Sequence, residues 1–516
     1  MLQRAAKKRA RLRGAKIDGI IFLYHEAEPK TAVPGTERMV SSMKMTPELT
    51  SRIDAWVDAH QEEYLADLAK LIAHPSRAPG GHYEGAHPFG DECAAALDEA
   101  AEIAKGYGFS TEIRDYYCLV LGLGEGEEKV GILGHLDIVP ASGEWHYPPF
   151  QLTRREDDLL IGRGVLDDKG PLWASVFAAR CLKELGLLPK RRLEFFCGSD
   201  EECGMEDLVY YKKTSEQLPV VAFTPDGSYP ICHGEKGIMD FTLDIPVEGS
   251  NIVDFVGGAA HNIVPDHAEL VLSGVRAEDA AKCFAGSQWV TVAQEGENVR
   301  ITSSGIAMHA STPEGGVSAI KNIADGLRGS SVLNAAAEKA VAYVSQCLAD
   351  YYGASIGVPY EDEPSGKLTH VAGMIDMADG VIHLHINIRY PVTCDGTKIS
   401  GEIRSLAATY GAGFSALRDS KPIYIPAESD LVHLCMETID SVFHRDWQPY
   451  TMGGGTYARL MTNAYALGPE DPGFESPFGI GGGGAHQPDE CVSLELMLNT
   501  AKVYARLFLG LDELTF

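Results

Sequence analysis

The feature that most constrains the fold is a repeated pairing of a short apolar run with a polar motif at its end. The runs are residues 129–133 (KVGIL), 193–197 (LEFFC) and 220–223 (VVAF). Short apolar runs of this kind predict buried strands. Between the first two lies segment 170–187, whose apolar residues recur at helical spacing. Alternating strands and helices predict an α/β/α layered domain with a mainly parallel sheet.

The pattern changes after Gly237. Segments 239–245 and 382–388 (IHLHINI) alternate apolar and polar residues, as strands with one solvated face do. We therefore predict an inserted α+β domain over residues 238–420. The histidines of IHLHINI suit such a half-buried strand, so no functional role is assigned to them.

Helical patterns flank these regions at residues 51–74, 431–443 and 492–508. They predict that residues 45–237 and 421–516 together form the domain that contains the parallel sheet. The inserted domain would then interrupt one folded unit.

Residues 1–44 stand apart from this pattern. Their first 16 residues are strongly basic and are followed by a short apolar run at 20–24. A secretory signal needs an apolar stretch of about 7–15 residues, so secretion is not expected. We predict that 1–44 is a disordered or non-native leader.

Charge and cysteine content exclude several classes of protein. The chain has 73 acidic and 44 basic residues, a formal net charge of −29. This charge disfavours binding to nucleic acid or to anionic membranes. Its 11 cysteines include no CxxC pair, as expected of reduced thiols in the cytoplasm. No apolar run approaches the roughly 20 residues of a membrane span.

Five short motifs contain the residue types that could carry chemistry, and each lies beside a predicted strand or a glycine turn. In chain order they are GHLD (134–137), GRGVLDDKG (162–170), SDEECG (199–204), TPDG (224–227) and HQPDE (486–490). Open α/β sheets place their sites in the loops that follow the strands. The motifs are therefore candidates for one shared site.

Each motif alone also has an ordinary structural explanation. A capping aspartate, an acidic helix N-terminus, an exposed acidic loop, a Pro-Asp-Gly turn and a surface histidine would account for them one by one. Together they supply two histidines and three or more carboxylates. Such a set suits a pair of Zn²⁺ or Mn²⁺ ions better than copper or an iron–sulfur cluster.

The order of the motifs resembles the family of co-catalytic zinc metallopeptidases, which includes PepV-type dipeptidases, carnosinases, carboxypeptidase G-like enzymes and acylamino-acid deacylases. The resemblance extends from about residue 46 to the C-terminus. It implies that His135 and Asp226 hold one metal ion and that Glu202 and His486 hold the other. Asp167 would bridge the two ions.

The resemblance also implies the catalytic roles. Asp137 would orient His135, and Glu201 would be the general base that activates a water between the two ions. His309, in the inserted domain, would stabilise the oxyanion. The inserted domain would thereby act as a lid over the substrate.

Further matches favour the PepV-like branch. Asp at position 226 and the motif GGGTYAR (453–459) are typical of that branch. Asn262 and Arg389 match the lid residues that bind substrate, with Arg389 gripping a C-terminal carboxylate. A last set of substrate-binding residues comes from GGGTYAR: Gly454, Gly455 and Thr456.

The resemblance implies a cytoplasmic, monomeric dipeptidase that uses two Zn²⁺ per subunit, with Mn²⁺ or Co²⁺ as substitutes. Its substrate would be a dipeptide or very short peptide. Two alternatives stay open: a deacylase or carboxypeptidase of the same family that acts on N-acyl amino acids, and a non-catalytic protein that binds peptide or metal.

Overall fold

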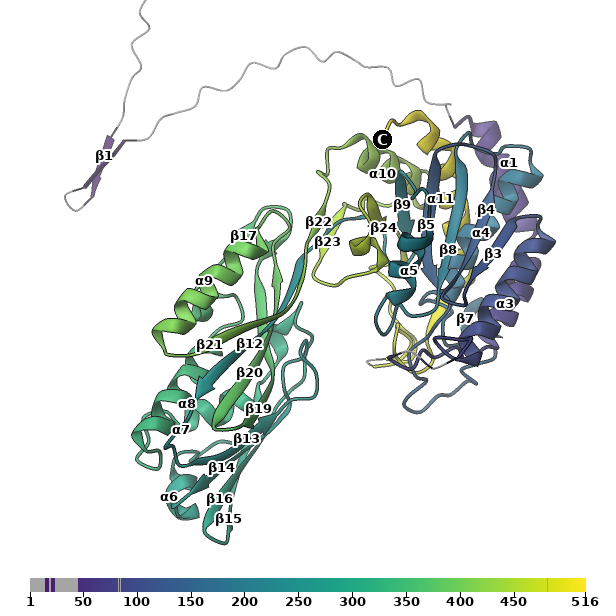
Figure 1. Ribbon diagram of the computed structural model, residues 1–516. Coiled ribbons are helices and arrows are strands. Elements are labelled where there is room, and N and C mark those ends of the chain that lie inside the picture. The colour runs from purple at the N-terminus through teal and green to yellow at the C-terminus, as the bar shows by residue number, and fades with distance from the viewer. Residues whose placement is uncertain (1–13, 18–19, 24–44, 82, 84, 480) are drawn as a thin grey trace, which may run out of the picture. The chain divides into compact units, whose positions relative to one another are not determined.

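The computed structural model describes residues 14–17, 20–23, 45–81, 83, 85–479 and 481–516 (Figure 1). The chain divides into two compact units, Met1–Ser42 and Met43–Phe516. In the first, β1 (Gly14–Ile17) pairs with β2 (Ile20–Leu23) in antiparallel fashion. The prediction of disorder over the rest of 1–44 lies outside the described residues.

The main sheet of the second unit has nine strands among the described residues, in the order β22-β11-β24-β9-β5-β8-β4-β3, with β23 beside β11. Its strands are β3 (Ser110–Arg114), β4 (Cys118–Leu123), β5 (Lys129–His135), β8 (Arg192–Gly198), β9 (Val221–Thr224), β11 (Cys232–Glu235), β22 (Ile423–Tyr424), β23 (Tyr450–Met452) and β24 (Ala464–Ala466). The central strands β8, β5, β9 and β24 run parallel. The prediction of a mainly parallel sheet is confirmed.

Helices on both faces of this sheet complete the layers (Figure 1). They are α1 (Pro47–Ala59), α2 (Gln61–Ile72), α3 (Asp91–Gly106), α4 (Lys169–Glu184), α5 (Glu206–Thr214), α10 (Asp430–Phe443) and α11 (Leu494–Gly510). The helical pattern over 51–74 corresponds to two helices, because the backbone leaves helical geometry at His60 (φ −108°, ψ 12°). Among the helices of the described ranges, none is both long and apolar enough to span a bilayer.

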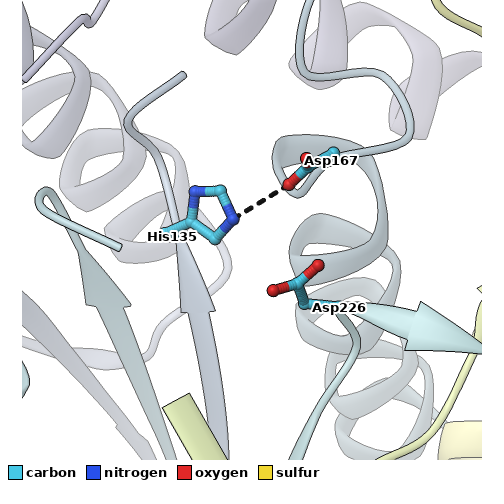
Figure 2. Close-up of side chains that lie close together, drawn as sticks. All are labelled: His135, Asp167 and Asp226. Carbon is cyan, nitrogen blue, oxygen red and sulfur yellow. Dashed lines mark ion pairs between the residues drawn. The ribbon is translucent and has the colours of Figure 1, made fainter. Parts of the chain in front are cut away.

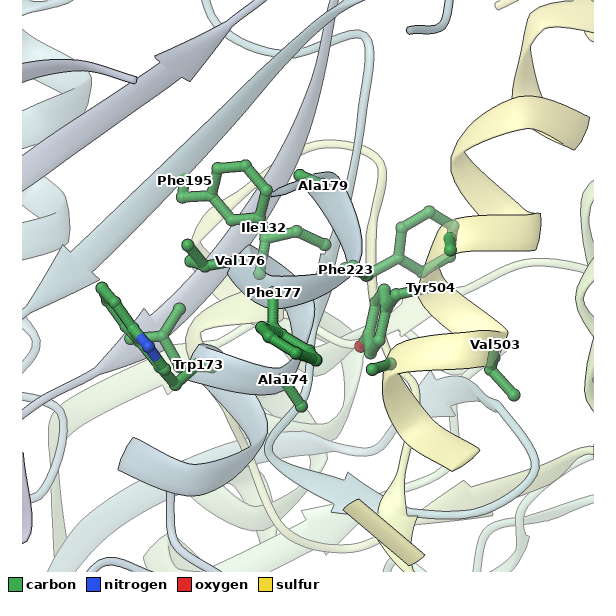
Figure 3. Packing of buried hydrophobic residues seen from close by; sticks show 14 of the residues in the cluster. Ile132, Trp173, Ala174, Val176, Phe177, Ala179, Phe195, Phe223, Val503 and Tyr504 are labelled. Atoms are coloured by element: carbon green, nitrogen blue, oxygen red, sulfur yellow. The ribbon is translucent and has the colours of Figure 1, made fainter. Parts of the chain in front are cut away.

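The core of this domain forms where α4 and α11 pack on each other and on the sheet (Figure 3). Trp173 and Phe177 of α4, Phe195 of β8 and Tyr504 of α11 belong to one apolar cluster, and all four are fully buried. Burial of each large apolar side chain contributes roughly 1.5–3 kcal/mol to folding. Because α4 begins at Lys169, within the 162–170 segment, this packing also fixes the position of the turn before it.

Small sheets of two or three short strands hold several loops in place. β26 (Cys491–Ser493) pairs with β7 (Leu159–Ile161), and β7 pairs with β6 (Thr153–Arg154). The remaining short strands form two pairs: β10 (Gly227–Ser228) with β25 (Pro469–Glu470), and β17 (Glu361–Asp362) with β18 (Gly366–Lys367). The β26–β7 pairing brings the 486–490 loop to the 162–170 turn, where the Gly162 amide donates to the Glu490 carbonyl at 3.0 Å.

A second sheet forms a separate layer with its own apolar core. Its eight strands in the described part of the chain have the order β15-β16-β14-β13-β19-β20-β12-β21, with every pairing antiparallel. They are β12 (Gly237–Pro246), β13 (Ile252–Gly257), β14 (His267–Ser273), β15 (Val290–Glu295), β16 (Asn298–Ser304), β19 (Thr369–Ala378), β20 (Val381–Tyr390) and β21 (Gly413–Ser420). The accompanying helices are α6 (Ala277–Lys282), α7 (Ala319–Leu327), α8 (Ala335–Cys347) and α9 (Gly396–Thr409). An inserted α+β layer is thus present.

Strand β20 contains the IHLHINI segment. Its isoleucines and leucine are fully buried, whereas His383 and His385 lie on the opposite face. His383 pairs with Asp244 at 2.7 Å and His385 with Asp376 at 2.5 Å. These ion pairs account for both histidines within the sheet.

Candidate metal centre and active site

The five predicted metal ligands lie in two overlapping groups. His135, Asp167 and Asp226 form the first, and Asp167, Glu202 and His486 form the second. Within each group, one potential ligand atom from every residue lies within 4.8 Å of the others. In Figure 2 the imidazole of His135 faces the carboxylates of Asp167 and Asp226. Asp167 belongs to both groups, which places it between them.

The order of the strands explains why these residues meet. His135 ends β5, Glu202 follows β8 and Asp226 follows β9. Strands β8, β5 and β9 are parallel neighbours, so their carboxyl ends lie side by side at one edge of the sheet. Asp167 reaches the same edge from the turn before α4, and His486 reaches it from the loop before β26.

The potential ligand atoms lie close enough together for several of them to bind the same cation. Nε2 of His135 lies 3.0 Å from Oδ1 of Asp167. Nε2 of His486 lies 3.0 Å from Oδ2 of Asp167 and 3.2 Å from Oε1 of Glu202. Nonetheless, His135 Nε2 and Glu202 Oε1 are buried atoms without a hydrogen-bond partner among the described residues. Because buried polar atoms normally have a partner, converging lone pairs of this kind fit divalent cations.

The protonation of the cluster without metal supports the same fit. Burial, reinforced by the charge of Asp167, raises the pKa of Asp226 to about 8. Hydrogen bonds to Asp167 and Glu202 raise the pKa of His486 to about 11. Near neutral pH, protons therefore occupy positions that a cation would take. Two imidazoles and three carboxylates match the ligands that Zn²⁺ uses in proteins.

Metal binding should stabilise the protein more at pH 8 than at pH 6. The raised pKa of Asp226 destabilises the metal-free fold as pH rises from about 4, its unfolded value, towards 8. The raised pKa of His486 stabilises the metal-free fold. This stabilisation is complete below about pH 6.5, the pKa of the unfolded state, and is lost as pH rises towards 11. A cation displaces both protons, so its affinity increases with pH.

Differential scanning fluorimetry of chelator-stripped protein with and without Zn²⁺ would measure this effect. At a fixed metal concentration about 100 times the Kd at pH 8, we expect about 2.7 kcal/mol of added stability at that pH. The increase in Tm should be larger at pH 8 than at pH 6. Equal increases at the two pH values would contradict the proton displacement.

Asp137, the residue expected to orient His135, contacts the imidazole ring of His135. Its carboxylate is completely buried, with Oδ1 3.5 Å from Nδ1 of His135. The Asp137 backbone carbonyl lies 3.0 Å from the same ring nitrogen. The second carboxylate oxygen of Asp137, Oδ2, accepts the backbone N–H of Glu202 at 3.1 Å. Contacts on Nδ1 leave Nε2 of His135 facing Asp167, as expected for a metal-ligating histidine.

Two further carboxylates support the ligands and were not assigned from the sequence. Asp168 is fully buried, and its Oδ2 accepts the backbone N–H of His135 at 3.2 Å. Glu490 is also fully buried and pairs with Arg163 at 2.6 Å. Both residues belong to motifs that the sequence singled out, but neither motif reveals its partner.

Glu490 holds the turn that carries Asp167. It accepts the backbone N–H groups of Gly164, Leu166 and Asp167 at 2.8–3.1 Å. Four residues earlier, His486 has φ +62°, a left-handed conformation that is unfavourable for a residue other than glycine. The same short loop therefore orients His486 and supports the backbone of Asp167.

The predicted substrate residues of the inserted domain lie close to one another. Nδ2 of Asn262 is 3.4 Å from Nε2 of His309, and Nδ1 of His309 is 2.7 Å from the Ser311 hydroxyl. Partial burial and the charge of Arg389 lower the pKa of His309, which favours the neutral imidazole. Nε of Arg389 donates to Asn387 at 2.9 Å.

Arg389 also contacts the glycine-rich GGGTYAR segment, because its Nη1 donates to the Gly453 carbonyl at 2.8 Å. Gly454 and Gly455 follow without side chains, and a Cβ on Gly455 would collide with the Arg459 guanidinium. The Thr456 hydroxyl is buried and donates to Glu235 at 2.7 Å. Within the described residues, no hydrogen bond or ion pair joins this substrate group to the two ligand groups.

A parallel-sheet domain with paired histidine–carboxylate groups at its strand ends, interrupted by an antiparallel α+β insertion, is the architecture expected of a metallopeptidase with a lid domain. The chain belongs to Peptidase family M20/M25/M40, whose model matches residues 131–510. Members of this family depend on metal, in agreement with the two ligand groups.

Two curated relatives are similar over most of the chain. “Putative dipeptidase YtjP” of Bacillus subtilis (strain 168) is 31% identical over 432 residues, which cover 81% of this chain and 90% of that protein. “Beta-Ala-Xaa dipeptidase” of Lactobacillus delbrueckii subsp. lactis is 30% identical over 431 residues, with 80% and 89% covered.

A solved structure shares the fold. The crystal structure of human carnosine dipeptidase 1 has a TM-score of 0.53 and 15% sequence identity, covering 91% of this chain and 100% of that chain. At this identity the similarity concerns the fold alone. It agrees with the predicted arrangement of a layered catalytic domain and an inserted lid.

Proposed function

We propose that this metallopeptidase is a dipeptidase that hydrolyses dipeptides or very short peptides with the aid of two Zn²⁺ ions. The observation that carries the proposal is the pair of ligand groups that share Asp167. The names of the curated relatives point to the same substrate class. We further propose that the chain acts as a monomer.

The two ligand groups support an assignment of side chains to each ion. His135 and Asp226 would hold one ion, Glu202 and His486 the other, and Asp167 both. Bound Zn²⁺ supplies Lewis acidity, which polarises the scissile carbonyl and lowers the pKa of a water. The rest of the reaction depends on side chains of this chain.

Glu201 is the proposed general base. It immediately precedes the ligand Glu202 in the turn after β8. Burial, with the charge of Asp226 next in importance, raises the pKa of Glu201 well above its usual value, so the carboxyl binds a proton readily. Glu201 would remove a proton from the attacking water and then give it to the amine that leaves.

The lid residues would bind the two ends of the reacting peptide unit. A neutral His309 can donate one hydrogen bond to the oxyanion, and Asn262 lies beside it. Asn387 and Gly453 accept from Nε and from one N–H of Nη1, so we assign the remaining N–H groups of Nη1 and Nη2 to the substrate's C-terminal carboxylate. Closure of the lid would complete the site, which favours short substrates.

A substrate panel tests the proposal. Protein stripped of metal by a chelator should be inactive. Added Zn²⁺ or Mn²⁺ should restore hydrolysis of free dipeptides such as Ala-His and Leu-Gly. N-acetyl and N-succinyl amino acids should be poorer substrates, as should dipeptide amides, which lack the carboxylate that Arg389 would bind. Reaction can be followed by the release of free amino acids.

Other outcomes of the panel would redirect the assignment. Turnover of only the acylated compounds would make the protein a deacylase or carboxypeptidase. Absence of turnover with every metal, while peptide still binds, would indicate a binding protein.

A further inference from the structure

The loop that carries Glu201 rests on a buried carboxylate from outside the five motifs. Asp207, in the first turn of α5, is completely buried. Its Oδ2 accepts the backbone N–H groups of Ser199 at 2.6 Å and Asp200 at 2.9 Å. The same oxygen accepts the hydroxyl of Tyr457 at 2.5 Å. One carboxylate oxygen thus gathers three donors.

These bonds join two functional segments of the catalytic domain. Ser199 and Asp200 directly precede Glu201, whereas Tyr457 directly follows the proposed substrate residue Thr456. A Cβ on Gly198, the last residue of β8, would collide with both the Tyr457 hydroxyl and Oδ2 of Asp207. Only glycine leaves room there for the two groups to meet.

The hydroxyl of Tyr457 is held in place by its surroundings. The Tyr457 side chain is fully buried, and its ring packs edge-on against Phe196 with centroids 5.3 Å apart. On either side in the sequence, Thr456 and Arg459 are anchored to Glu235, at 2.7 Å and 3.3 Å. The ring therefore has a defined position from which its hydroxyl reaches Asp207.

We propose that Asp207 and Tyr457 are positioning residues for Glu201. Neither side chain touches the substrate in this assignment. Asp207 holds the backbone of the loop by two amides, and the Tyr457 hydroxyl holds the carboxylate of Asp207. Three hydrogen bonds converge on one buried side-chain oxygen, so they restrict the movement of the loop. The proposal rests on the proposed role of Glu201 as general base.

Loss of the Tyr457 hydroxyl should displace the base loop slightly without removing any reacting group. Proton transfer depends steeply on geometry, and a misplacement of about 1 Å can lower a rate about 10²-fold. The binding of substrate through Arg389 and of metal through the five ligands should be far less affected. The expected signature is therefore a change in kcat with KM and metal content preserved.

The experiment compares Tyr457→Phe with Tyr504→Phe in the full-length, metal-loaded protein. Tyr504 is also fully buried in the catalytic domain, and its hydroxyl donates one bond, to the Leu467 carbonyl at 2.9 Å. Both variants lose one buried hydrogen bond, so both should lower Tm. Only Tyr457→Phe should lower kcat, by about tenfold or more, with KM changed less than about threefold. Equal kcat in the two variants would overturn the proposal.

A double-mutant cycle with Glu201→Gln separates positioning of the base from a general disturbance. If Tyr457 acts through Glu201, Tyr457→Phe should have no further effect on the residual kcat of Glu201→Gln. A further tenfold loss in that background would contradict the proposal. Should Tyr457→Phe fail to fold, Asp207→Asn replaces it in both comparisons with the same expected results.

The wild-type substrate panel keeps this test distinct from the test of function. If wild type hydrolyses only N-acyl amino acids, the dipeptidase proposal fails, and the Tyr457→Phe to Tyr504→Phe comparison is made with that substrate. If the two variants then have nearly equal kcat, the positioning role is rejected independently of the dipeptidase proposal.

Discussion

Glu201→Gln is expected to lower kcat for dipeptide hydrolysis by about 10²–10⁴-fold, the usual contribution of a general base. Glutamine keeps the size of the side chain but cannot accept a proton from water. Because Glu201 belongs to neither ligand group, the variant should retain its metal ions. Steady-state kinetics with Leu-Gly, together with metal analysis by mass spectrometry, would measure both quantities.

Glu216→Gln provides the matched control, since Glu216 is exposed and the chemical change is the same. Its kcat should equal that of wild type. A Glu201→Gln enzyme with kcat within about threefold of wild type would reject the base assignment, given the factor of at least about 10² expected of such a base. Loss of metal from Glu201→Gln would instead identify Glu201 as a ligand.

Asp167→Asn is expected to lose both metal ions and nearly all activity. Each oxygen of Asp167 lies 3.0 Å from a different histidine, Oδ1 from His135 and Oδ2 from His486. Asparagine replaces one oxygen with an amide NH2, which is a poor ligand for a cation, and removes the negative charge. Since the reaction depends on both ions, kcat should fall by about 10³-fold or more.

Asp226→Asn is the informative comparison because Asp226 belongs to only one ligand group. Asp226→Asn should lose one ion and retain the other, whereas Asp167→Asn should retain neither. Metal content after dialysis, measured by mass spectrometry, distinguishes the two. If both variants keep the same number of ions, Asp167 does not bridge the groups.

Much of the candidate site can be predicted from the sequence because its ligands are tied to local structure. His135, Glu202 and Asp226 each lie at or within a few residues of the end of an apolar run that forms a strand. Parallel strands bring their carboxyl ends to a common edge, so such residues have a physical reason to meet. The resemblance to a known family adds the order of the motifs and the role of each residue.

The supporting residues could not be predicted in the same way. The Tyr457 hydroxyl bonds to Asp207 across 250 positions of the chain, and the Asp167 amide bonds to Glu490 across 323. Nothing in the local sequence around Asp207 distinguishes it from an acidic residue at an ordinary helix N-terminus. The roles of such residues depend on which distant segment lies against them.

The sequence by itself determined the α/β layers, the α+β insertion and the residue types of a metal site, because hydrophobic periodicity and short motifs are local properties. Tertiary structure decided the order of β8, β5 and β9, the distances within the two ligand groups, and the partners of the buried carboxylates Asp207 and Glu490. The physical reason is that a buried charge is stable only with its partners in place. Packing of α4 and α11 on the sheet brings those partners together.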